Sequence, residues 1–104
     1  MPTLYKTEFS IAAIGSIARD SSISSATTIA IPANATGVLI QADTGDVRFT
    51  FDGTEPTSTL GLVLIDGAPA TRLDLFPGAE IKVLSASGAV NYQFYRAQDS
   101  NGLF

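Results

Sequence analysis

Apolar and polar residues alternate along most of the chain, and this two-residue period predicts β-strands rather than helices. The clearest case is residues 46–51, where Val47, Phe49 and Phe51 would share one face of a strand. Strands are predicted at residues 27–31, 37–42, 46–51, 62–65, 71–75, 80–85 and 90–96. About seven short strands, separated by turn residues, predict an all-β fold: a single antiparallel β-sandwich with a distinct N-terminal arm.

The alternation also predicts which side chains face the core of this sandwich. Ile81 and Val83 are expected to point inward from one strand, and Tyr92 and Phe94 from the last strand. The run at residues 62–65 differs, because each of its residues is apolar. Such a run is typical of a strand that is buried on both faces.

The N-terminal segment, residues 1–25, has a different pattern and ends in a polar linker at residues 20–25. Ile11, Ile14 and Ile17 recur at every third position, but β-branched side chains and an intervening glycine disfavour a helix. The segment is either an extra strand on the core or an arm that reaches a neighbouring subunit. We therefore divide the chain into an arm and linker (1–25), a β-sandwich domain (26–97) and a C-terminal tail (98–104).

Composition narrows the possible chemistry. The chain has 104 residues and contains neither cysteine nor histidine. Without cysteine it forms no disulfide and no thiolate metal site, and without histidine it has no Ser-His-Asp triad and lacks the commonest zinc ligand. We therefore expect no enzymatic activity, no catalytic residue, and neither a metal ion nor another cofactor.

The charge distribution bears on possible partners. Six basic and ten acidic residues give a net charge of −4, and the basic residues are scattered singly, so we expect no nucleic-acid binding. No apolar stretch approaches the roughly 20 residues of a spanning helix, and no persuasive export signal is present, so we expect no membrane association and synthesis in the cytoplasm. Only 15% of the residues are charged, which indicates either a small β-domain with a well-filled core or an apolar surface that neighbouring subunits partly cover.

Four acidic residues lie close together in the sequence and raise the question of a calcium site. They are Asp43, Asp46, Asp52 and Glu55. Their spacing does not match an EF-hand loop, and Asp52 followed by Gly53 is better explained by a tight turn. We therefore predict no metal ligand among them.

The segment VRFTFDGTEPT at residues 47–57 resembles the motif V-R-Y-T-x-D-G-T-x-P-T, which recurs in two groups of small β-sandwich proteins. One group is the chitobiase C-terminal-type sandwich repeat of secreted carbohydrate enzymes. The other comprises short phage structural proteins, and here the resemblance extends over residues 26–97. It includes the apolar strand GVLIQA before the motif and IKVLSA after it.

The motif also has a direct physical interpretation as a sandwich corner. Asp52 and Gly53 would bend the chain after a strand, and Pro56 has no N–H to give to a sheet. The hydroxyls of Thr54 and Thr57 can form hydrogen bonds with nearby backbone. We expect these residues to act as a structural turn and not as an active site.

The phage resemblance implies a head decoration, or cement, protein. Such a protein is made in the host cytoplasm and binds the major capsid protein on the outer surface of the virion, where it stabilises the shell, often as a homotrimer. A phage tail or head–tail component is the first alternative. A carbohydrate-binding adhesive module is the second, although the chain has no tryptophan.

Candidate contact residues come from the N-terminal segment and from outward positions of the strands. Tyr95 is the strongest candidate among the tyrosines, because it is predicted to face outward and tyrosine is enriched at interfaces. Arg48 and Arg96 are either interface residues or part of solvated strand faces. The full set is Tyr5, Ile11, Ile14, Ile17, Arg48, Tyr95 and Arg96.

Overall fold

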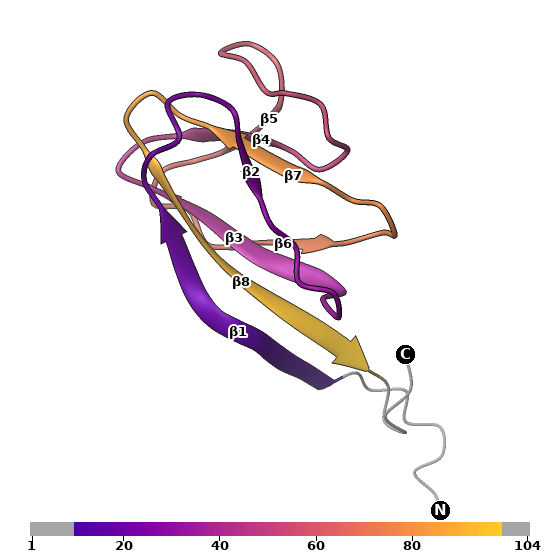
Figure 1. Cartoon of the computed structure of the whole chain (residues 1–104). Helices are drawn as coiled ribbons and strands as arrows, with labels where there is room; N and C mark the ends of the chain where they lie inside the picture. Colours follow the sequence, from indigo (N-terminus) through magenta and orange to yellow (C-terminus); the bar gives the residue numbers. More distant parts are fainter. Residues whose placement is uncertain (1–9, 99–104) are drawn as a thin grey trace, which may run out of the picture.

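The structure, a computed structural model, describes residues 10–98 and has two antiparallel four-stranded sheets (Figure 1). The strands are β1 Ser10–Asp20, β2 Thr27–Ile29, β3 Gly37–Asp43, β4 Val47–Thr50, β5 Leu62–Leu64, β6 Thr71–Asp74, β7 Ile81–Leu84 and β8 Ala89–Gln98. One sheet has the order β1-β8-β3-β6, and the other has the order β2-β7-β4-β5. The predicted all-β sandwich is confirmed.

The core lies between the two sheets and is built from alternate residues of their inner strands. Its fully buried members include Val38, Ile40 and Val90 from the first sheet and Val47, Ile81 and Val83 from the second. The predicted inward positions of Ile81, Val83 and Phe94 are confirmed, and Tyr92 packs partly buried against this core. Alternation thus identified the inner faces because each sheet has one covered and one open face.

One core residue comes from the segment that was predicted to be a polar linker. Ile23 is only 1% exposed and belongs to the core cluster. Its carbonyl accepts a hydrogen bond of 2.8 Å from the backbone N–H of Ser85. The linker prediction was wrong at this position, because a single isoleucine among serines gives no periodic signal in the sequence.

The segment Ser10–Asp20 forms β1, an edge strand that runs antiparallel along β8. Figure 1 shows the two strands side by side, although they come from opposite ends of the chain. Ile14 is partly buried against the core, whereas Ile11 and Ile17 are 54% and 69% exposed. Of the predicted N-terminal arm, residues 1–9 lie outside the described residues, as do residues 99–104 of the predicted tail.

A β-bulge interrupts β1 in its middle. Ile14 pairs with Phe94 and Ala18 pairs with Tyr92, so three residues of β1 stand opposite Gln93 alone. The first of the three is Gly15, whose φ of +72° is unfavourable for residues with a side chain. The Gln93 side-chain amide donates hydrogen bonds of 3.1–3.2 Å to the carbonyls of Ile14, Gly15 and Phe94. These contacts hold the irregular part of the strand on the sheet.

The strand predicted to be buried on both faces proves to lie at an edge. β5 pairs with β4 alone, and Leu62 and Val63 are 54% and 42% exposed, so that prediction was wrong. Only Leu64 is buried, because it faces the core from the strand's inner side. A continuous apolar run does not distinguish a central strand from an edge strand whose surface is left uncovered.

Candidate interaction surfaces

The Asp52–Gly53 turn is fixed by contacts within the chain. The Asp52 carboxylate accepts a hydrogen bond of 3.0 Å from the backbone N–H of Thr54, and this bond lowers the pKa of Asp52 below its ordinary value. Gly53 has a φ of +89° and donates its N–H to the carbonyl of Glu80 at 3.1 Å. A Cβ at this position would also lie 2.7 Å from a carboxylate oxygen of Glu80. The turn therefore favours glycine mainly for its conformation, because the Glu80 carboxylate is the end of an exposed side chain that can move aside.

The threonines of the same motif are also used internally. The hydroxyl of Thr50 donates to the carbonyl of Thr54, and the hydroxyl of Thr57 accepts the backbone N–H of Leu60 at 3.0 Å. Pro56 is buried and lies outside the strands. The polar groups of the motif thus shape a corner of the sandwich.

On the outer face of the β1-β8-β3-β6 sheet, Tyr95 lies across Gly37. An added Cβ at Gly37 would be 2.1 Å from the Cζ atom of Tyr95, so the ring occupies the space that a side chain would fill. The Tyr95 hydroxyl accepts a hydrogen bond of 2.8 Å from Nε of Arg72 and donates one of 3.2 Å to Asp74. The guanidinium carbon of Arg72 lies 5.5 Å from the ring centroid. Tyr95 therefore links β8 to β6 across β3.

This packing changes what Tyr95 can contribute to an interface. Tyr95 faces outward in the strand alternation but is only 2% exposed. Burial raises the pKa of its hydroxyl above the ordinary value, while the hydrogen bond to Tyr95 raises the pKa of Arg72. Arg72 and Asp74 are both exposed, so a partner approaching this face would meet their charges before the ring.

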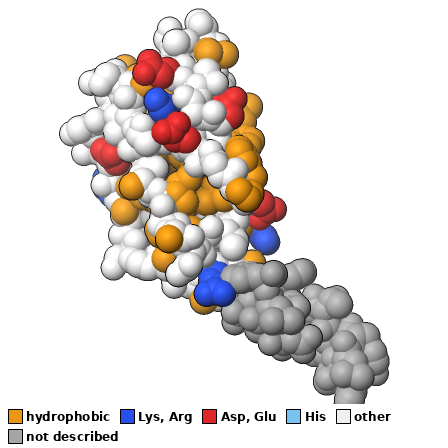
Figure 2. All heavy atoms as spheres, turned by 45° about the vertical axis from the view of Figure 1, so that its right-hand side comes forward, with side chains coloured by type: hydrophobic (Ala, Val, Ile, Leu, Met, Phe, Trp, Pro, Cys, Tyr) orange, Lys and Arg blue, Asp and Glu red, His pale blue; other side chains and the backbone are white. Residues whose placement is uncertain are grey.

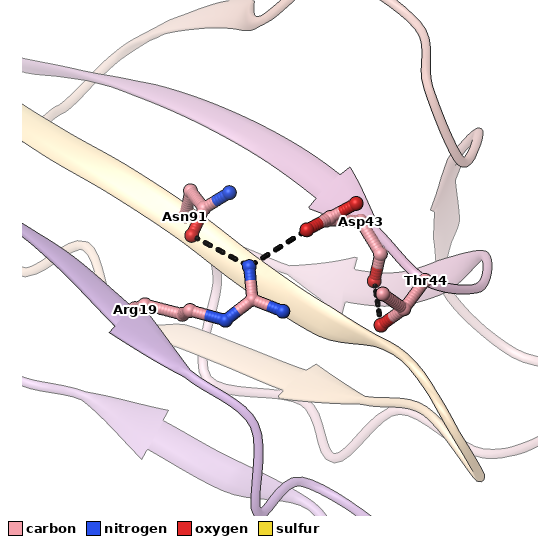
Figure 3. Close-up of polar contacts among 4 residues, drawn as sticks. All are labelled: Arg19, Asp43, Thr44 and Asn91. Carbon is pink, nitrogen blue, oxygen red and sulfur yellow. Dashed lines mark hydrogen bonds and ion pairs between the residues drawn. The ribbon is translucent and has the colours of Figure 1, made fainter.

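A second polar group joins three strands at the other end of this sheet (Figure 3). One guanidinium nitrogen of Arg19, on β1, donates to Asp43 on β3 at 2.8 Å and to Asn91 on β8 at 3.2 Å. About half of each charged side chain is exposed, at 45% for Arg19 and 49% for Asp43. The ion pair therefore contributes modestly to stability and helps to align the edge strand.

The predicted contact residues do not form one site. Ile11, Ile17 and Tyr95 belong to the first sheet, whereas Arg48 lies on the second sheet, where it donates to the carbonyl of Gly61 at 2.9 Å. Arg96 is half-buried near the end of β8. Tyr5 lies outside the described residues.

The sequence analysis missed an exposed apolar segment that we call the β5 edge, residues 60–65. Its exposed members are Leu60 at 52%, Leu62 at 54%, Val63 at 42% and Ile65 at 56%. The segment contains no charged residue. The signal was present in the sequence as an unbroken apolar run, but it was interpreted as a sign of burial.

A second apolar surface lies at one end of the sandwich, between the β2–β3 and β6–β7 connections. Figure 2 brings this end forward and shows hydrophobic side chains gathered there. The groove has a volume of about 600 Å³ and no charged residue in its lining: Ile31, Pro32, Ala33, Ala35, Thr36, Leu75, Phe76, Pro77, Gly78 and Ala79. Phe76 is 45% exposed and packs edge-on against Phe51, with ring centroids 6.0 Å apart. This lining suits apolar contact and offers no group for acid–base chemistry.

The four acidic residues considered for calcium each have a different partner. Asp46 accepts the backbone N–H of Asp66 at 2.8 Å, and Glu55 lies 4.0 Å from Lys82. Within residues 10–98, no three acidic side chains come close enough together to hold a metal ion. The same part of the chain has no helix that is long and apolar enough to cross a membrane.

Comparisons of the chain with models of known families, with curated proteins and with solved structures found no match.

Proposed function

We propose that this protein is a structural, non-enzymatic subunit of a bacteriophage particle, of the head decoration or cement type. Its partner would be the major capsid protein on the outer surface of the head, and its copies would form a symmetric homo-oligomer, a trimer by the resemblance. The proposal is supported by the sequence of residues 47–57 and by the order of segments around it over residues 26–97.

The observation that carries the proposal is the kind of surface the fold leaves open. The β5 edge and the groove around Phe76 are apolar and uncharged, and they lie on a chain with a net charge of −4. Uncovered apolar patches bordered by polar residues are typical of protein contact sites. By contrast, the polar groups of the turn motif form hydrogen bonds within the chain. The open surfaces therefore favour contact with another protein over a catalytic role.

The physical consequences suit a decoration role. A subunit that binds only the assembled shell stabilises it by mass action, and many copies on one particle act together through avidity. A small cysteine-free sandwich needs no oxidative maturation before it is added to a shell.

The test is the copy number of the protein in purified particles, measured by quantitative mass spectrometry against the major shell protein. A ratio near one to one supports a decoration layer, and a few copies per particle would support a tail or head–tail component instead. Absence from particles would refute both phage roles. A glycan array would then test the carbohydrate-binding alternative.

A second experiment asks which surface meets the shell. Shells that lack the protein are mixed with the purified chain or with Phe76→Lys, Leu62→Lys or Ile17→Lys, and bound protein is measured after sedimentation. We expect a charge in one of the two apolar surfaces to reduce binding strongly. Equal binding by the first two variants and the unaltered chain would refute a role for those surfaces.

A further inference from the structure

Within residues 10–98 the two sheets have four free edges, and three of them carry features that discourage pairing with another strand. β1 is interrupted by the bulge at Gly15, and β6 exposes the charged pair Arg72 and Asp74. β2 is only three residues long, exposes the polar Thr28 and is soon followed by Pro32. Bulges, charges, proline and short length are the devices that prevent edge-to-edge association.

The β5 edge has only one of these devices, its short length. It carries no charge and no proline, and its exposed side chains are apolar on both sides of the strand. Its backbone pairs with β4 on one side only. An edge of this composition favours a partner strand that is itself extended, apolar and uncharged.

We propose that this partner is the β5 edge of a second copy of the chain, paired antiparallel about a two-fold axis at Val63. Among the four free edges of the described sheets, β5 is the one with matching chemistry. The pairing would join the β2-β7-β4-β5 sheets of two copies into one continuous sheet. It requires no shell protein, so it does not rest on the proposed function.

The proposed register is compatible with the charges and shapes at this edge. Pairing about Val63 places Leu62 opposite Leu64, and Ile65 opposite Gly61. Ile65, the most exposed residue of the edge at 56%, would thus face a residue without a side chain. The nearest acidic residue, Asp66, would face Leu60, so no two like charges oppose each other.

The first test is the mass of the purified full chain in solution, by light scattering after size-exclusion chromatography over a range of concentrations. A two-fold contact alone gives a dimer, and combined with a separate three-fold contact it gives a hexamer. We expect Leu62→Lys to reduce the dimer to a monomer, or the hexamer to a trimer. The control Ile17→Lys alters a more exposed apolar residue on the other sheet and should leave the mass unchanged.

The second test uses the absence of cysteine from the sequence. In an antiparallel pair, directly opposite Cα atoms lie about 4.5–5.5 Å apart, which a disulfide can span. Val63→Cys should therefore give a cross-linked dimer on oxidation. Leu39→Cys is a matched control, because Leu39 has a similar exposure of 38% but lies on the outer face of the first sheet.

Circular dichroism of each variant establishes that it is folded before its mass is compared. An unaltered chain that stays a monomer or a trimer at all concentrations would overturn the proposal. So would cross-linking of Leu39→Cys to the same extent as Val63→Cys. Either result leaves the copy-number test of the decoration role unaffected.

Discussion

Alanine in place of Gly37 is the most direct test of how Tyr95 holds the outer face of the first sheet together. The added methyl group would lie 2.1 Å from Cζ and 2.2 Å from the hydroxyl oxygen of Tyr95. Because Gly37 is on a paired strand and has ordinary β backbone, the conflict is with the ring and not with the backbone conformation. The ring must therefore leave its position across β3.

The cost can be estimated from the contacts that the ring would lose. Displacement breaks two hydrogen bonds, to Arg72 and Asp74, worth about 1 kcal/mol each, and overpacking adds about 1–3 kcal/mol. Replacing glycine by alanine restricts the unfolded chain and returns about 0.4–1 kcal/mol. We therefore expect Gly37→Ala to lower the free energy of unfolding by about 2–4.5 kcal/mol, a large part of the stability of a small domain.

A double-mutant cycle separates this explanation from a general intolerance of side chains at position 37. In a Tyr95→Val background no ring crosses β3, so Gly37→Ala should be neutral or slightly stabilising. Urea unfolding followed by far-ultraviolet circular dichroism measures all four proteins. Gly78→Ala is the control: its φ of +87° implies strain, but nothing lies within 4 Å, so its cost should be the same in both backgrounds. Equal costs of Gly37→Ala in the two backgrounds would refute the reasoning.

Three further predictions follow from polar contacts. Gln93→Ala should lower the free energy of unfolding by about 1–2 kcal/mol, because the side-chain amide that donates to three carbonyls is lost. Gln93→Glu should cost more, because a carboxylate cannot donate to those carbonyls. Thermal unfolding compares the two variants. Burial raises the pKa of Tyr95 above its ordinary value of 10.0, so above about pH 10 the folded chain keeps a proton that the unfolded chain releases. The free energy of unfolding should therefore fall as the pH rises above about 10. In Tyr95→Phe this decrease should be less steep. Arg19→Met should lower the free energy of unfolding by at most about 1 kcal/mol, and this loss should become smaller in high salt. A loss that salt does not change would contradict a surface ion pair.

The sequence was informative where packing imposes a simple period. Ile81 and Val83 were predicted to face the core and do so, because each inner strand alternates between a covered and an open side. Val47 and Phe49 were predicted to share one face, and both are buried. The turn at Asp52 was predictable for a similar reason, since aspartate followed by glycine has a strong local preference.

The sequence was uninformative where the outcome depends on which strands become neighbours. The position of β5 at an edge is set by the order β2-β7-β4-β5, which joins segments far apart in the chain. The covering of Tyr95 depends on Gly37 and Arg72, which lie 58 and 23 positions before it (95 − 37 and 95 − 72). No local pattern reports such contacts, so an outward position was interpreted as an exposed one.

The turn motif and the β5 edge are adjacent in the chain, and their roles are complementary. The polar side chains of the motif form hydrogen bonds within the chain: Asp52 accepts one from the N–H of Thr54, and Thr57 accepts one from the N–H of Leu60. These bonds fix the start of the segment that follows, and Arg48 holds the carbonyl of Gly61 from the neighbouring strand. The apolar residues from Leu60 onward are thus presented on a fixed corner before any partner arrives. Because that ordering is completed during folding, a partner strand would lose less free energy to ordering on binding, which favours contact at this edge over contact at a mobile loop.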